Sequence, residues 1–100
     1  MTSNDDVQIR EVADRHRFEI LLAGERVGHV TYRDGGGART FIHTETDPDR
    51  QGQGLAGRLV KYALDAARAD GMRVVAECSY VQAFIERNPD YADLVGGASS

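Results

Sequence analysis

A chain of 100 residues can bury one hydrophobic core but not two, so the sequence predicts a single domain. Its 12 Lys and Arg residues against 16 Asp and Glu residues leave a formal net charge of -4, which excludes a general attraction to nucleic acid or to an anionic membrane. There is no apolar leader at the start and no apolar run near the ~18 residues of a membrane span, and the single cysteine cannot form an internal disulfide, so we expect a cytoplasmic protein.

The first half of the chain predicts four strands. Apolar and polar residues alternate over 7–13, Arg17–Leu22, 26–33 and Ala38–Thr46, and short polar or glycine-rich segments separate these runs. Strands joined by such short turns pair antiparallel. In the fourth strand, strict alternation predicts that Phe41, His43 and Glu45 share one face while Ile42 and Thr44 share the other. Residues 1–6 are expected to be a disordered N-terminus.

The second half predicts a β-α-β unit followed by a short helix. Apolar residues repeat at helical spacing over Leu55–Ala69, and Gly71 is suited to end that helix in a left-handed conformation. The strand expected at 72–77 must run parallel to the fourth strand because a helix connects them. Ser79–Arg87 is predicted as a second helix, capped by Ser79, and 96–100 as a disordered tail. The fold class is therefore α/β (α+β), with a mixed five-stranded sheet.

A glycine-rich loop stands immediately before the first predicted helix. Glycines let main-chain N–H groups approach a phosphate closely, and the helix directs its unpaired N–H groups and positive dipole end at the same point. The loop therefore predicts a site for a pyrophosphate-bearing ligand. The residues expected to bind it are Arg50, Gln51, Gly52, Gln53, Gly54, Leu55, Ala56 and Gly57. Arg58 and Lys61, within the next turns, are further phosphate candidates against the alternative of a solvated helix face.

Two nucleotide-binding patterns overlap in this loop. Gly52-x-Gly54-x-x-Gly57 matches the dinucleotide pattern, but residues 47–51 separate its first glycine from the preceding strand, and too little chain follows for a doubly wound sheet. The absence of Gly-Lys-Ser/Thr excludes a P-loop. The other pattern, Gln51-x-x-Gly54-x-Ala56, resembles the acetyl-coenzyme A signature of the GNAT acetyltransferase superfamily. We take it as the leading interpretation, with NAD binding as an alternative.

Three further blocks extend this resemblance to the very small YjdJ-type GNAT subgroup. They are residues 41–46 (FIHTET), Cys78, and residues 84–91 (FIERNPDY). The similarity spans residues 7–95 and implies a GNAT-like acetyltransferase domain there. It also implies that strands four and five separate after Thr46, that the pantetheine arm of coenzyme A pairs with main chain near Glu45 to Asp47 (Thr46 and Asp47 being the cofactor-binding candidates), and that the acetyl thioester lies near Cys78.

Three side chains are candidates for catalysis. Cys78 stands before a predicted helix, where the dipole lowers a thiol pKa, although a small buried hydrophobe is the alternative. Glu45 is the candidate general base, against a solvated carboxylate, and His43 lies about 7 Å from it along the strand, as a proton relay or a packed residue. One cysteine and three dispersed histidines show no ligand spacing, so no metal is predicted.

The sequence thus predicts an acetyl-CoA-dependent N-acetyltransferase acting on an unidentified amine, as a monomer, without nucleic acid or membrane partners. The alternative is a non-catalytic acyl-CoA-binding or interaction module. Larger GNAT enzymes wall their acceptor pocket with helices where this chain has only residues 14–16. They also often place a tyrosine acid where this chain has Ile85.

Overall fold

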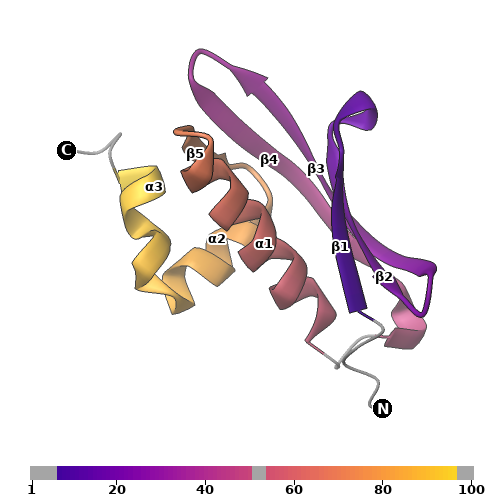
Figure 1. Ribbon diagram of the computed structural model, residues 1–100. Coiled ribbons are helices and arrows are strands. Elements are labelled where there is room, and N and C mark those ends of the chain that lie inside the picture. Colours follow the sequence, from indigo (N-terminus) through magenta and orange to yellow (C-terminus); the bar gives the residue numbers. More distant parts are fainter. Residues whose placement is uncertain (1–6, 51–53, 97–100) are drawn as a thin grey trace.

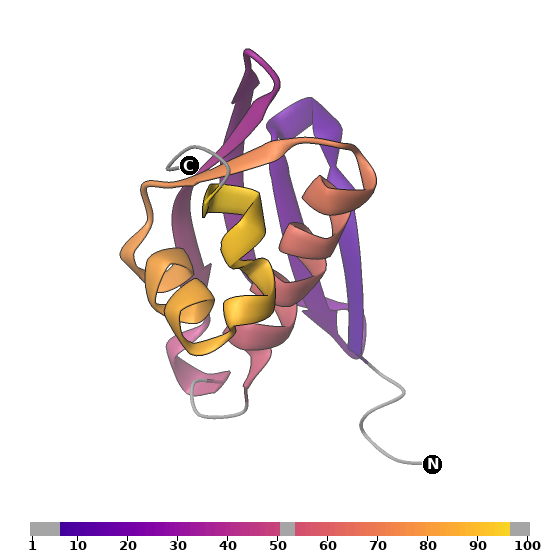
Figure 2. The ribbon, with the colours of Figure 1, turned by 90° about the vertical axis from the view of Figure 1, so that its left-hand side faces the viewer.

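The computed structural model describes residues 7–50 and 54–96, which form a sheet with helices gathered on one side (Figures 1 and 2). The strands are β1 (Val7–Val12), β2 (Arg17–Leu22), β3 (Glu25–Gly35), β4 (Ala38–Thr46) and β5 (Arg73–Ala76). They lie in the order β1-β2-β3-β4-β5, with three antiparallel pairings followed by a parallel pairing of β4 with β5. The predicted mixed five-stranded sheet is confirmed.

The helices are α1 (Leu55–Ala69), α2 (Ser79–Arg87) and α3 (Ala92–Gly96). The bounds of α1 and α2 match the prediction, and Gly71 has the expected positive φ of 71°, whereas α3 was not predicted. The predicted cap at Ser79 is wrong, because Cys78 is the N-cap residue of α2 and no side chain caps that end. No helix in the described part of the chain is long and apolar enough to cross a bilayer.

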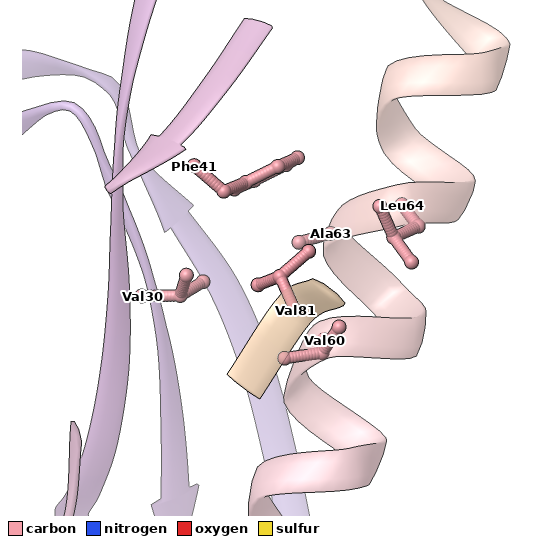
Figure 3. A pocket seen from close by; sticks show the side chains of 6 residues that line it. All are labelled: Val30, Phe41, Val60, Ala63, Leu64 and Val81. Atoms are coloured by element: carbon pink, nitrogen blue, oxygen red, sulfur yellow. The ribbon is translucent and has the colours of Figure 1, made fainter. Parts of the chain in front are cut away.

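The core lies between the sheet and α1 and is completed by α2. Side chains from these three sources converge in Figure 3: Val30 and Phe41 from the sheet, Val60, Ala63 and Leu64 from α1, and Val81 from α2. Each of these residues is at most 1% exposed. The space among their side chains admits no water molecule. Burying each large apolar side chain contributes about 1.5–3 kcal/mol, so this contact fixes α1 on the sheet.

The C-terminal segment is attached to α1 through polar contacts. The hydroxyl of Tyr91 donates to Asp65 at 2.6 Å, and Arg68 donates to the Asp93 carboxylate at 2.8 Å and to the carbonyl of Asp90 at 2.9 Å. Tyr91 is buried. Helix α3 is therefore held against the rest of the molecule from the C-terminal half of α1.

A β-bulge in β4 changes which residues share a face. Pairing with β3 passes from Thr31↔His43 to Tyr32↔Phe41, so Ile42 is an extra residue. Phe41 consequently points into the core. His43 and Glu45 lie on the opposite face, on which the described residues place no helix and which we call the helix-free face. The prediction that Phe41 shares a face with them is wrong because strict alternation does not hold across a bulge.

Close packing of β3 against β4 at Gly28 gives a test of this register. A Cβ at Gly28 would lie 2.9 Å from Thr46 Cγ2, 3.0 Å from the Glu45 carbonyl oxygen and 3.1 Å from Ile20 Cγ2. We expect Gly28→Ala to lower the free energy of unfolding by about 1–3 kcal/mol, because the backbone must move to relieve these contacts. Urea denaturation measures the change.

Gly35→Ala is the matched control, because a Cβ at Gly35, also on β3, meets no atom within 4 Å. It should leave the unfolding midpoint nearly unchanged. Equal stability of the two variants would contradict the close approach at Gly28.

Candidate functional site

The N-terminus of α1 opens toward the predicted phosphate loop. Gly54 precedes the helix with φ 75°, a left-handed conformation, although a Cβ there would meet nothing within 4 Å, so glycine is favoured here by conformation. Among the described residues no side chain caps this end, and the first turn has no acidic residue. Its first-turn N–H groups and positive dipole end therefore face the loop.

The sequence-predicted loop residues fall into two groups. Gln51, Gly52 and Gln53 lie outside the described residues, and Arg50 ends the short turn Pro48–Arg50 that leads to them. Of those in α1, Leu55 is buried in the core, and a Cβ on Gly57 would face Tyr80 and Phe84 of α2. What Leu55, Ala56 and Gly57 present to the loop is therefore main chain.

The two cationic candidates on α1 differ in their surroundings. Lys61 Nζ lies 2.9 Å from Asp65, four residues further along the same helix. Its charge is thus already partnered within α1. Arg58 is exposed on the first turn, where its side chain is closer to the helix N-terminus than that of Lys61.

Strands β4 and β5 separate where the bulge begins. Their parallel ladder ends at Phe41 and Ala76, and the Phe41 carbonyl then accepts hydrogen bonds from the N–H groups of both Glu77 (3.0 Å) and Cys78 (3.1 Å). The sequence analysis placed this separation after Thr46, and that prediction is wrong: the ladder ends five residues earlier, at Phe41. The early fork follows from the shortness of β5 and from the extra residue in β4.

Main chain of β4 borders this fork on one side. Asp47 donates its N–H to Val27 at 2.7 Å, and in an antiparallel pair alternate residues bond to the neighbouring strand. Thr44 and Thr46 therefore direct their N–H and carbonyl groups away from β3, toward the side that β5 has left. Asp47 also accepts the N–H of Asp49 at 3.0 Å, which forms the turn out of the strand.

Cys78 lies at the fork, with its sulfur surrounded by hydrogen-bond donors. The residue is 8% exposed, and its Sγ lies 3.3 Å from Thr44 Oγ1. The sulfur also accepts the main-chain N–H groups of Tyr80 and Val81 at the start of α2 and that of Thr44 on β4. Burial alone raises the pKa of the Cys78 thiol, but these hydrogen bonds outweigh it, so the pKa is below that of an ordinary cysteine. A thiolate therefore forms more readily here than on an ordinary cysteine, as expected at a helix N-terminus.

Glu45 lies on the other face of β4, beside two histidines. Its Oε1 is 3.8 Å from His43 Nε2 and 3.7 Å from His29 Nε2, and His29 is its cross-strand neighbour in the ladder. Burial, followed by the charge of Arg17, lowers the pKa of His29, which Glu45 offsets only in part. His29 is therefore largely neutral near pH 7 and able to accept a proton.

The structure thus joins some predicted residues and separates others. His43 and Glu45 come together on the helix-free face, whereas Cys78 contacts Thr44 on the side of the helices. His29 was not predicted as a site residue, because the register of an unbulged β3–β4 hairpin places Gly28 opposite Glu45, and the extra residue in β4 shifts Glu45 to His29. Within residues 7–50 and 54–96 no three ligand-type side chains are grouped to hold a metal ion.

The contact between Thr44 and Cys78 gives a test of the thiol environment. We expect Thr44→Val to raise the pKa of Cys78, because the hydroxyl next to the sulfur is lost while the side-chain shape is kept. The pH dependence of the thiolate ultraviolet absorbance measures this. Thr40→Val, the same substitution elsewhere on β4, is the control and should not move the titration, and an identical titration in the Thr44 variant would contradict the geometry.

The sequence is similar to a known family and to individual proteins. A sequence model of the family described as GCN5-related N-acetyl-transferase matches residues 17–94. Protein NATD1 of Bos taurus is 38% identical over 85 residues, covering 83% of this chain and 75% of the relative. Protein NATD1 of Xenopus tropicalis is 25% identical over 91 residues, covering 89% and 84%.

Two solved structures share the fold. A GCN5-like protein from Staphylococcus aureus superposes with a TM-score of 0.70 at 23% identity, over 89% of this chain and 87% of its own. N-acetylglutamate synthase from Neisseria gonorrhoeae, complexed with coenzyme A and N-acetyl-glutamate, gives a TM-score of 0.57 at 14% identity, over 74% of this chain and 20% of its own. Taken with the sequence match over residues 17–94, the chain belongs to the GCN5-related N-acetyltransferase family.

Proposed function

We propose that the protein is an acetyl-CoA-dependent N-acetyltransferase that transfers the acetyl group to an amine. The observation that carries this proposal is that the uncapped N-terminus of α1 and the strand fork beside Cys78 belong to one β4-α1-β5 unit, both toward the carboxyl end of β4. The first suits a diphosphate, and the second suits an extended chain that needs main-chain partners.

Coenzyme A would be held mainly by main chain. Residues 50–57 would bind its diphosphate, with Arg50 or Arg58 adding charge. The outward carbonyl group of Thr44 and the outward N–H and carbonyl groups of Thr46 would pair with the pantetheine arm, because the Thr44 N–H already donates to the Cys78 sulfur. The N–H groups at the start of α1 suit the anionic diphosphate, and the main chain of β4 suits the amide groups of the pantetheine arm. The described residues carry no side chain that caps α1 and competes for this position.

Transfer requires a neutral amine, which attacks the thioester carbonyl as a C–N bond forms and the C–S bond breaks. Glu45, with His43 beside it, is the base that would take the amine proton, and it reaches the thioester from the helix-free face. Cys78 lies across β4 from Glu45. Its thiol would protonate the departing thiolate in a direct transfer, or its thiolate would first take the acetyl group in a covalent route.

The two routes differ in a directly measurable way. In the covalent route, intact mass spectrometry after incubation with acetyl-CoA should show the mass of one added acetyl group. The adduct should disappear in Cys78→Ala, because this is the only cysteine in the chain. If wild-type protein acetylates an amine without ever carrying the adduct, direct transfer is the route.

A charge placed at the helix N-terminus tests the phosphate site. We expect Gly54→Glu to abolish coenzyme A binding in a calorimetric titration, because a carboxylate would occupy the anion position. Gly71→Glu is the control: Gly71 has a similar φ of 71°, with open space around it, at the other end of α1. Both variants carry a similar strain of about 1–2 kcal/mol, but only the first should lose the coenzyme.

The same titration decides between coenzymes. The acetyltransferase proposal predicts that coenzyme A binds far more tightly than NADH. Comparable affinities for the two would favour the dinucleotide interpretation of the glycine loop.

A non-catalytic acyl-CoA-binding module is the second candidate, and one observation favours it. Among residues 7–50 and 54–96 no helix covers the face that carries Glu45 and His43 (Figure 1). This function predicts coenzyme A binding without acetyl transfer to any amine in a broad panel. Turnover that depends on Gly54 would exclude it.

A further inference from the structure

A hollow on the helix-free side of the sheet lies at the ends of β3 and β4. It has a volume of about 260 Å³, and its walls include Arg26, Gly28, His29, Glu45 and Asp47. Thr46 is also in the wall, one strand position from Glu45 and two from Thr44 at the fork, which is about 7 Å along a strand. A molecule in this hollow would therefore reach the proposed acetyl group from the side opposite Cys78.

Positive charge is in excess on one side of this hollow. Glu19 is 3% exposed and is contacted by three arginines: Arg17 at 2.8 Å, Arg10 at 3.1 Å and Arg26 at 3.2 Å. Burial raises the pKa of Glu19, but the hydrogen bonds from the arginines outweigh it and keep the carboxylate ionised. Three guanidinium groups against one carboxylate leave two positive charges uncompensated within this cluster.

Arg26 is the member of the cluster that reaches the hollow. It contacts Glu19 through Nη1, which leaves its other N–H groups unused by that carboxylate, and its side chain is 46% exposed. A guanidinium group, with its planar fork of donors, is the side chain best suited to bind a second carboxylate.

The lining of the hollow also carries negative charge. The side chain of Glu45 is 64% exposed and lies next to His29, whose pKa is lowered. Asp47 also lines the hollow. A guanidinium group on β3 and carboxylates at the end of β4, in the lining of one hollow, complement a ligand with a carboxylate and an amine. A hollow of about 260 Å³ is below the ~300–1,000 Å³ of drug-sized pockets, so this ligand is small.

We propose that this hollow binds the acetyl acceptor and that the acceptor is a small primary amine bearing a carboxylate, such as a free amino acid. The carboxylate binds Arg26, and the amine lies at Glu45, which removes its proton before attack. This inference rests on the proposed acetyltransferase function and adds the class of acceptor to it.

Matched ligands separate recognition of the carboxylate from recognition of the amine. The probes are alanine, glutamate and lysine, each compared with its α-carboxamide, which keeps the amine and removes one negative charge. Amide NMR spectra of the full chain are followed during each titration in the presence of coenzyme A. We expect the signals of Gly28, His29 and Thr46 to shift with at least one amino acid, and its carboxamide to bind about tenfold more weakly or worse.

Substitution of the arginine tests the assigned partner. Arg26→Gln should remove the preference for the carboxylate, while Arg26→Lys, which keeps the charge but not the fork of donors, should retain part of it. Arg33→Gln is the control, because Arg33 is also an exposed arginine on β3 but faces Glu77 at 3.6 Å, away from the hollow. Circular dichroism verifies folding, and Glu19 keeps two arginine partners in each Arg26 variant.

Acetyl transfer to the same six compounds is measured in parallel. Carboxylate-selective binding without acetylation would support the site and contradict the acetyltransferase function. Acetylation of carboxamides as fast as of amino acids, or shifts unaffected by Arg26→Gln, would overturn this inference while leaving the acetyltransferase function intact. Absence of both binding and transfer would overturn this inference, while the acetyltransferase function is decided by the broad amine panel.

Discussion

The carbonyl group of Phe41 fixes the geometry on which the site depends. It accepts two N–H groups, from Glu77 and Cys78, where the β4–β5 ladder ends and the bulge at Ile42 begins. Had the ladder continued, the outward main chain of Thr44 and Thr46 would be paired within the sheet. The early end of the ladder instead leaves these groups facing a fork, with Cys78 at its closed end.

Alternation along β4 puts the chemical groups of the site on two sides of one strand, and the bulge determines which of them face the helices. Thr44 turns toward the helices and contacts Cys78, whereas His43 and Glu45 face the side on which the described residues place no helix. A thioester arm along the edge of β4 would have a low-pKa thiol on one side and a carboxylate–histidine group on the other. Under the proposed function, this arrangement would let the two substrates approach β4 from different directions without displacing each other.

Sequence patterns predicted the elements well because the driving contacts are local. Period-2 alternation located β2 and β4, and the apolar stripe on α1 predicted its bounds and its packing on the sheet. The bulge at Ile42 was not predicted, because a one-residue register change depends on pairing between strands and leaves no trace in the alternation. The role of His29 as neighbour of Glu45 and the arginine cluster around Glu19 likewise arise from cross-strand register. Helix α3 was not predicted because it is short. Contacts with Arg68 and Asp65 of α1, rather than a helical propensity of its own, hold its segment in place.

The central claim is that coenzyme A lies with its diphosphate at the N-terminus of α1 and its arm in the fork between β4 and β5. A crystal structure of the protein with coenzyme A tests it most directly. The account predicts pantetheine amide groups bonded to the main chain of Thr44 or Thr46, with the thiol beside Cys78. Coenzyme A bound elsewhere, or a fork closed by continued pairing of β4 with β5 beyond Phe41, would contradict it.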